Sequence, residues 1–426
     1  MSFEEAKKLD DHFVMHTFNR KPVMLVEGSG MEVTDDQGKT YLDFIAGIGA
    51  DSLGHCHPAV SEAIAAQAKR LIHVSNYYYI ENRGEVAKII SDLLNTCVPK
   101  FFRAPWPVFF ANSGAEANEC AIKLARLYSK KEGSGGQTII TMDGSFHGRT
   151  LATLSATAQP AKQEAFAPLP DGFVHVPMND MNAVHRAFFE NPGDVCAIML
   201  ECVQGESGIH PWDPDVLYDV CQFARKNGML IIVDEVYRCG EFPFSFQNMG
   251  ITPDIITMAK GIASGFPMGA CAARIEVAEA FEPGDHGSTF GGSNLAMAAA
   301  HATLATLSRG HFDEDVQELG DYFAEGLDKI DGITEVRGMG LMIGADLEEG
   351  IDANLVVAKG LEEGFLLNAT SAHTLRFLPP LIVTRKEIDQ LLEALPGMID
   401  AVRKGWTPQE DQPEDSAEED TEFLAQ

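Results

Sequence analysis

Short apolar runs alternate with longer segments of helical periodicity through the middle of the chain. The apolar runs cover residues 108–110, 138–142, 197–200, 229–233 and 255–259. They are nearly all apolar and too short for helices, so we expect them to be buried strands. Segments 59–72, 81–95 and 115–131 are predicted to be helices, and further helical segments precede residue 229. Strands alternating with helices predict an α/β fold with a mostly parallel sheet.

The pattern differs at both ends of the chain. Residues 31–34 and 40–44 flank the turn-rich Asp35-Asp36-Gln37-Gly38 and predict a β-hairpin. From about residue 305, helix 313–330, strands 334–337, 341–346 and 375–377, and helix 385–403 predict a smaller α+β unit. The predicted organisation is therefore a small domain built from residues 1–58 and 305–405, a large ligand-binding domain of residues 59–304, and a tail of residues 406–426.

Composition indicates a globular protein of the cytoplasm. The chain has 426 residues, of which 45% are hydrophobic and 22% charged. No apolar run is long enough to span a membrane, and the N-terminus lacks the apolar core of a signal peptide. The eight cysteines are scattered without a CxxC pair, which is typical of reduced thiols.

A net charge of −31 argues against nucleic acids and anionic membranes as partners. Part of the excess is local, because TPQEDQPEDSAEEDTEFLAQ at the C-terminus holds eight acidic residues and no lysine or arginine. We interpret this tail as solvated and disordered.

Polar side chains follow each predicted strand, where ligands bind in open parallel sheets. In chain order these are Ser113-Gly114-Ala115-Glu116, the segment SFHGRT (145–150), Glu201 to Glu206, Asp234 and Lys260. Three of them also have a simple structural explanation. Lys260 could extend into solvent, Ser113 to Glu116 could be a helix capping box, and Asp234 could cap the next segment.

Taken together, the same residues suggest a ligand. A desolvated lysine attacks carbonyl groups, a glycine at a helix N-terminus binds phosphate, and a carboxylate pairs with a protonated ring nitrogen. These three chemistries predict pyridoxal phosphate (PLP). Competing signals are weaker, because His55-Cys56-His57 lacks a second Cys/His cluster for a metal and Gly47-x-Gly49 is a poor dinucleotide fingerprint. We therefore predict no metal site.

Several co-linear motifs resemble those of the class III (ω-amino acid) aminotransferases. They are ANSGAEANECAIKLAR, SFHGRT, VQGESG, VDEV, PDIITMAKG, GSTFGGSNLA and LRFLPPL. GHCHP, HVSNYYY and DGSFHGRTLATLSATAQP are similar to the acetylornithine branch of that family. The resemblance covers about residues 15 to 400. It implies the PLP transferase fold of the aspartate aminotransferase type (fold type I) and a homodimer with sites at the subunit interface.

The resemblance also implies roles around the cofactor. Lys260 would bind PLP covalently and carry the proton between substrate and cofactor, and Asp234 would pair with the pyridine nitrogen. Val236 and Phe146 would contact the two ring faces. The phosphate would be bound by Ser113, Gly114 and Ala115, together with Thr289 of the neighbouring subunit.

For the substrates, the resemblance implies that Arg149 holds the α-carboxylate of the amino donor. Arg376 would be masked by Glu206 in one half-reaction and bind the α-carboxylate of glutamate or 2-oxoglutarate in the other. Ser288 would lie close to the substrate. A plain salt bridge between Glu206 and Arg376 is the alternative.

The chain departs from the family pattern near Asp234. Tyr237 stands where the family has a glutamine beside the cofactor's phenolic oxygen, and the loop from there to Lys260 is shorter. Cys202 stands where proline is usual. These departures bear on substrate choice, while Lys260, Asp234 and the phosphate segment are all present.

The expected reaction is transamination of N-acetylornithine with 2-oxoglutarate to N-acetylglutamate 5-semialdehyde and glutamate, a step of arginine biosynthesis. The alternatives are a related enzyme for succinylornithine, ornithine, 4-aminobutyrate or another ω-amine, an aminomutase of the same fold, and a non-catalytic PLP-fold binding protein.

Overall fold

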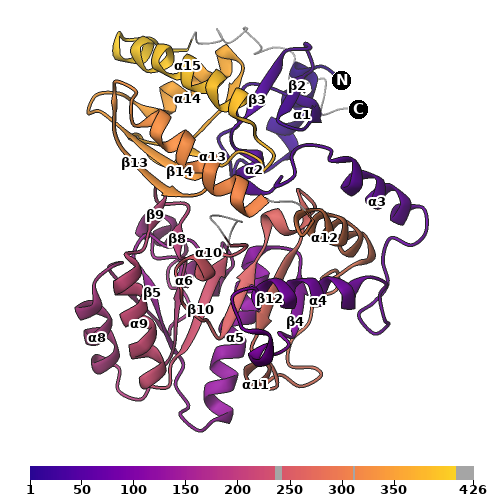
Figure 1. Cartoon of the computed structure of the whole chain (residues 1–426), viewed down its shortest axis with the longest axis vertical. Coiled ribbons are helices and arrows are strands. Elements are labelled where there is room, and N and C mark those ends of the chain that lie inside the picture. Colours follow the sequence, from indigo (N-terminus) through magenta and orange to yellow (C-terminus); the bar gives the residue numbers. More distant parts are fainter. Residues whose placement is uncertain (236–241, 310–311, 409–426) are drawn as a thin grey trace.

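A seven-stranded sheet lies at the centre of the larger part of the molecule (Figure 1). The computed structural model describes residues 1–235, 242–309 and 312–408. In spatial order the strands are β4 (Val108–Ala111), β12 (Gly269–Ala273), β11 (Ile255–Met258), β10 (Leu230–Glu235), β7 (Val195–Leu200), β5 (Thr138–Met142) and β6 (Phe173–Val176). Among the described strands of this sheet, β12 alone runs opposite to the other six. The predicted mostly parallel sheet is confirmed.

Helices cover both faces of this sheet, which explains why its strands appear in the sequence as continuous apolar runs. Ile198, Leu200 and Val233 belong to one core cluster, whereas Met199 and Ile232, which point the opposite way, belong to another. The first cluster includes residues of α4 (Arg83–Leu94), α8 (Met181–Glu190), α9 (Pro214–Lys226) and α12 (Asn294–Leu307), and the second includes residues of α5 (Gly114–Lys131).

The larger part of the molecule contains ten α-helices within the described residues. They are α3 (Pro58–Ala68), α4 (Arg83–Leu94), α5 (Gly114–Lys131), α6 (Leu151–Ala156), α7 (Pro160–Gln163), α8 (Met181–Glu190), α9 (Pro214–Lys226), α10 (Ser245–Asn248), α11 (Ile275–Ala278) and α12 (Asn294–Leu307). The short 3₁₀ helices are η1 (Lys100–Phe102), η2 (Glu164–Phe166) and η3 (Lys260–Ala263). In Figure 1, α8 and α9 lie side by side at one end of the sheet.

Two smaller sheets form the upper part of Figure 1. One contains β1 (Leu25–Ser29), β2 (Glu32–Asp35), β3 (Thr40–Asp43) and β15 (Phe365–Leu366). The other contains β13 (Ile333–Met339), β14 (Met342–Leu347), β17 (Thr374–Phe377) and β16 (Asn368–Ala369). The helices of this part are α1 (Phe3–Phe13), α2 (Ala46–Gly49), α13 (Phe312–Leu327), α14 (Ala353–Glu363) and α15 (Arg385–Arg403).

Strand β15, from the C-terminal part of the chain, pairs in parallel with β3 from the N-terminal part, so the two parts share one sheet. The β2–β3 hairpin, predicted from its turn residues, is confirmed. The domain boundaries after residues 58, 304 and 405 stay predictions.

The sequence did not indicate several elements. Strand β12 has the sequence GACAA, whose small residues give no apolar run, yet all five residues are buried. Helix α1 contributes no buried residue, so it leaves little core pattern to detect. Within the described residues, no helix is long and apolar enough to cross a membrane.

Candidate active site

Lys260 follows β11 and begins η3 at the carboxyl edge of the sheet. Its backbone φ is +50°, a left-handed conformation that costs a non-glycine residue about 1 kcal/mol or more and that clusters at functional sites. Burial lowers the pKa of the Lys260 amine, although the charge of Asp234 opposes the shift. A lowered pKa makes more of the neutral amine, which is the form that attacks a carbonyl group.

Asp234 lies near the end of the adjacent strand β10 and is only 8% exposed. Its Oδ2 accepts a hydrogen bond from Asn118 Nδ2 at 2.8 Å and lies 2.9 Å from His147 Nδ1. Thr257 Oγ1 lies 3.2 Å from the other oxygen, because Thr257 stands opposite Asp234 in the β10–β11 register. Burial lowers the pKa of His147, but Asp234 reverses this, so the net shift is upward. The network holds the carboxylate in one orientation.

The first turn of α5 lies beside these residues. Ser113 caps the helix, since its side chain accepts from the Glu116 amide at 3.2 Å. The predicted capping box is incomplete, because the Glu116 carboxylate accepts from the backbone and side chain of Asn112, at 2.9 and 2.8 Å. The amides of Gly114 and Ala115 lie in the first turn, where an α-helix offers no internal partner. This leaves donors for an anion.

Close backbone approaches bring the segments together. A Cβ added to Gly114 would lie 3.4 Å from the Cβ of Ala259, the residue before Lys260. A Cβ added to Gly148 would lie 2.8 Å from the Cβ of Ala115. The start of α5 therefore contacts both the lysine turn and the segment SFHGRT.

This residue set fits PLP. Amide donors at a helix N-terminus suit its phosphate, a buried carboxylate suits its protonated pyridine nitrogen, and an amine of lowered pKa suits its aldehyde. Ser113, Gly114, Ala115, Asp234 and Lys260 supply these groups on neighbouring segments.

Phe146 is anchored by Glu201, a residue at the end of β7 that is 3% exposed. The Phe146 amide donates to Glu201 Oε2 at 3.1 Å, and the Gly205 amide to Oε1 at 3.5 Å. Burial raises the pKa of Glu201 to about 7, and the charge of His147 opposes that shift. One carboxyl group thus joins the SFHGRT segment to the loop that carries Glu206.

Replacing Glu201 by glutamine is expected to change how stability depends on pH. The folded protein keeps this proton up to about pH 7, whereas the unfolded chain loses it near 4.5. The contribution of this bound proton to the free energy of unfolding is therefore complete below pH 4.5 and is lost as the pH rises through 7. Glutamine cannot ionise, so the stability of the variant relative to wild type should increase as the pH rises from 4.5 to 7. The total increase, reached above pH 7, should be roughly 3 kcal/mol.

Urea unfolding of both proteins at pH 5 and pH 8 measures this change. Glu235, whose pKa burial also raises to about 7, is present in both proteins and cancels from the difference. A stability difference that is the same at both pH values would contradict the assignment.

Arg376 on β17 forms a second polar centre and is 5% exposed. Its Nη1 donates to the Gly205 carbonyl at 2.8 Å and to Glu206 Oε2 at 3.0 Å, and its Nε donates to Asn368 Oδ1 at 2.9 Å. Burial raises the pKa of Glu206, but the charges of Arg376 and Lys162 outweigh it, so the net shift is downward. The predicted Glu206–Arg376 pair is present in the structure.

Arg149 is exposed, and its guanidinium lies 5.6 Å from the ring centroid of Phe146. An exposed guanidinium has N–H donors available for a carboxylate. Lys162 lies 5.0 Å from the same centroid. Two cations therefore lie close to the aromatic ring that is predicted to contact the cofactor.

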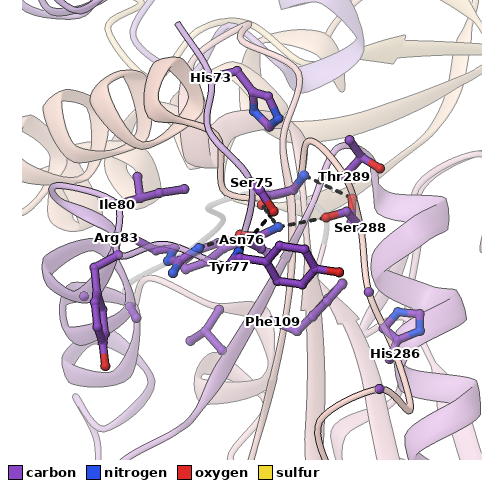
Figure 2. A pocket seen from close by; sticks show the side chains of 18 residues that line it. His73, Ser75, Asn76, Tyr77, Ile80, Arg83, Phe109, His286, Ser288 and Thr289 are labelled. Atoms are coloured by element: carbon purple, nitrogen blue, oxygen red, sulfur yellow. Dashed lines mark hydrogen bonds between the residues drawn. The ribbon is translucent and has the colours of Figure 1, made fainter. Parts of the chain in front are cut away.

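Ser288 and Thr289 line a cavity of about 1080 Å³ (Figure 2), and Ser288 Oγ accepts a hydrogen bond from Asn112 Nδ2 at 3.2 Å, beside the start of α5. Asn76 donates to the Ser288 carbonyl at 2.8 Å and accepts from Arg83 Nη1 at 2.5 Å. Among the described residues that line this cavity, neither Lys260 nor Arg149 occurs. The partner-subunit role of Thr289 and the substrate contact of Ser288 stay predictions.

Val236 and Tyr237 lie outside the described residues, so their predicted contacts with the cofactor stay predictions. Within the described part of the chain, no group of three or more His, Cys, Asp or Glu residues is arranged to hold a metal ion.

Five residues of this site were not predicted individually, although His147 and Glu201 lie in segments that follow predicted strands. They are Asn118, His147, Glu201, Thr257 and Lys162. Asn118 follows Gly114 by four residues, which places both on one helix face, and Thr257 is a polar residue within an apolar strand. These two signals could have been used.

Comparisons with known proteins agree with this geometry. The family model described as aminotransferase class-III matches residues 15–399. The acetylornithine aminotransferase of Caldanaerobacter subterraneus subsp. tengcongensis is 47% identical over 92% of this chain and 98% of its own length. That of Methanocaldococcus jannaschii is 47% identical over 95% of this chain and 100% of its own.

Solved structures are also similar. The ornithine aminotransferase from Toxoplasma gondii ME49 has a TM-score of 0.87 at 29% identity, covering 95% of this chain and 96% of that one. The acetylornithine aminotransferase from Elizabethkingia anophelis has a TM-score of 0.80 at 28% identity, covering 94% and 99%.

Proposed function

The chain belongs to the class III aminotransferases, and from this membership we propose that it transfers the amino group of N-acetylornithine to 2-oxoglutarate. The products are N-acetylglutamate 5-semialdehyde and glutamate, as in arginine biosynthesis. The observation that carries this substrate assignment is the similarity of nearly the whole chain to relatives named for acetylornithine.

PLP, when bound, withdraws electrons from the substrate carbon that carries the amino group. Lys260 is the proposed covalent attachment point and moves the proton at that carbon, since its amine has a lowered pKa. Asp234 is the proposed partner of the ring nitrogen, held by Asn118 and His147. Phe146 would pack against one face of the ring.

Each half-reaction places different demands on the carboxylate contacts. The acetylated donor has one carboxylate, which Arg149 is proposed to bind, while its acyl arm is uncharged. The acceptor 2-oxoglutarate has two, so Arg376 must become available as well. The Glu206–Arg376 contact supports a switch in which Glu206 neutralises Arg376 for the donor and releases it for the acceptor.

We also propose a cytoplasmic homodimer in which Ser288 and Thr289 serve the partner's site. Exposed aromatic side chains support this assembly, because large exposed apolar groups that lie together mark protein interfaces. Tyr77, Tyr79 and Phe290 are all exposed, and the first two line the cavity that contains Ser288 and Thr289.

A panel of amino donors tests the proposed reaction. Purified enzyme with PLP and 2-oxoglutarate is supplied with N-acetylornithine, succinylornithine, ornithine or 4-aminobutyrate, and glutamate is measured. The highest kcat/KM is expected for N-acetylornithine. A higher value for another donor would reassign the substrate, and no glutamate with any donor would reject the function.

Changing Arg149 to lysine is expected to weaken use of N-acetylornithine. Lysine keeps the charge but cannot form the paired hydrogen bonds of a guanidinium with a carboxylate. Loss of one charge-assisted contact costs roughly 1.5–3 kcal/mol, or about ten- to a hundredfold in kcat/KM. PLP affinity should change far less.

Steady-state kinetics and PLP titration measure the two effects. Arg385→Lys is a matched control, because Arg385 also lies over an aromatic ring, that of Tyr322 at 4.4 Å. Donor kinetics unchanged in Arg149→Lys would show that another residue binds the carboxylate.

A further inference from the structure

A second cation, Lys162, lies beside Glu206 in addition to Arg376. We propose that Lys162 is a positioning residue that receives the Glu206 carboxylate when a dicarboxylate displaces Glu206 from Arg376. This inference rests on the proposed function, because it extends the switch between the two half-reactions.

Glu206 already faces two cations through different oxygen atoms. Oε2 lies 3.0 Å from Arg376 Nη1, and Oε1 lies 3.6 Å from Lys162 Nζ. The first distance is a hydrogen bond, whereas the second exceeds ordinary hydrogen-bond length. The pair with Arg376 is therefore formed, and the pair with Lys162 can still shorten.

Local contacts hold Lys162 in this position. It lies on α7, its Nζ donates to Gln159 Oε1 at 2.5 Å, and it lies 5.0 Å from the ring centroid of Phe146. Its side chain is only 22% exposed. These contacts keep Lys162 near Glu206, at a distance that can still shorten.

A count of charges explains why the acceptor half-reaction needs this lysine. Arg149, Lys162 and Arg376 supply three positive charges, and Glu206 supplies one negative charge. The donor adds one carboxylate, so Glu206 can stay on Arg376. A dicarboxylate adds two, and each carboxylate has a cation only if Lys162 pairs with Glu206.

The protonation of Lys162 is coupled to the same groups. Burial lowers the pKa of the Lys162 amine, and the nearby charges of Arg149 and Arg376 lower it further, whereas Glu206 raises it. A closer approach of Glu206 therefore favours the ammonium form. When Glu206 leaves Arg376 and approaches Lys162, its negative charge stabilises the ammonium form of that lysine.

Replacing Lys162 by methionine tests this role and keeps an unbranched apolar side chain. The dissociation constant of glutarate, a dicarboxylate without a keto group, is measured by calorimetry on the PLP-bound enzyme. We expect affinity to fall by about fivefold to tenfold, as for loss of a partly exposed ion pair of about 1 kcal/mol. The rate of the half-reaction with N-acetylornithine should change less than twofold, and Lys162→Arg should restore glutarate binding.

Lys359 offers a matched control at a distance from the switch. Its side chain is 20% exposed, it pairs with Glu362 at 3.0 Å, and it lies 5.4 Å from a ring centroid of Trp406. Lys359→Met should leave both glutarate binding and the donor half-reaction unchanged. An equal loss of glutarate binding in both variants would overturn the inference.

A double variant separates a role through Glu206 from direct contact with the ligand. In the Glu206→Gln background no carboxylate needs a new partner, so adding Lys162→Met should no longer weaken glutarate binding. A loss that persists there would mean that Lys162 binds the dicarboxylate itself, which overturns the proposal. Unchanged glutarate affinity in the single variant also overturns it.

The wild-type enzyme distinguishes failure of this inference from failure of the proposed function. If wild type converts N-acetylornithine and binds glutarate but Lys162→Met behaves like wild type, only the role of Lys162 is rejected. If wild type neither binds glutarate nor forms glutamate, the proposed function is rejected, and the switch with it.

Discussion

Replacing Lys260 by alanine is expected to abolish transamination, with a loss of at least about 10⁴-fold in kcat. Proton transfer by a positioned side chain alone contributes up to about 10⁴-fold, and the covalent attachment is lost as well. The variant should still fold, because alanine faces the same φ of +50° and no desolvated amine remains. Glutamate formation measures the activity, and thermal unfolding without PLP measures the fold.

Lys260→Arg separates charge from proton transfer. Arginine keeps the positive charge but does not deprotonate in proteins, so this variant should be as inactive as Lys260→Ala. Substantial activity in either variant would show that another residue performs the proton transfer.

Replacing Asp234 by asparagine is expected to have the second-largest effect. The amide is nearly isosteric but carries no charge to stabilise a protonated ring nitrogen. Removing one partner of a buried ion pair costs about 3–5 kcal/mol, which corresponds to roughly 10²- to 10⁴-fold in kcat. The new amide would also face the donors of Asn118 and His147, so some further loss of PLP affinity is expected.

Asp254→Asn is a suitable control for this experiment. Asp254 is a 5% exposed aspartate beside the same sheet, where it accepts from the Ile231 amide at 2.8 Å and pairs with Arg274 at 2.7 Å. Its replacement should lower stability without the loss of catalysis. A similar fall in kcat in both variants would show that the loss in Asp234→Asn comes from a disturbed sheet and not from a lost contact with the cofactor.

The sequence predicted that Asp234 and Lys260 lie at one edge of the sheet, because a parallel sheet brings distant strand ends together there. Asp234 is the penultimate residue of β10, Lys260 follows the adjacent strand β11, and the β10–β11 register places Asp234 opposite Thr257. No detailed structure was needed for that step, only the recognition of apolar runs as strands.

Other contacts depend on how loops pack across the sheet edge. Glu201 contacts the Phe146 amide across 55 positions, and Lys162 approaches Glu206 from a four-residue helix. Glu201 follows a predicted strand, but its contact with Phe146 is not indicated by the sequence, and Lys162 does not stand out by type or spacing. The same limit applies to β12, whose small residues are buried because helix α5 packs closely on the strand.

The most direct test of the account is reductive fixing of the cofactor. PLP-loaded enzyme is treated with borohydride, digested, and analysed by mass spectrometry. We expect a phosphopyridoxyl group on Lys260 and on no other lysine, with no labelling in Lys260→Ala. Labelling of a different lysine, or of none, would contradict the assignment of this strand end as the PLP site.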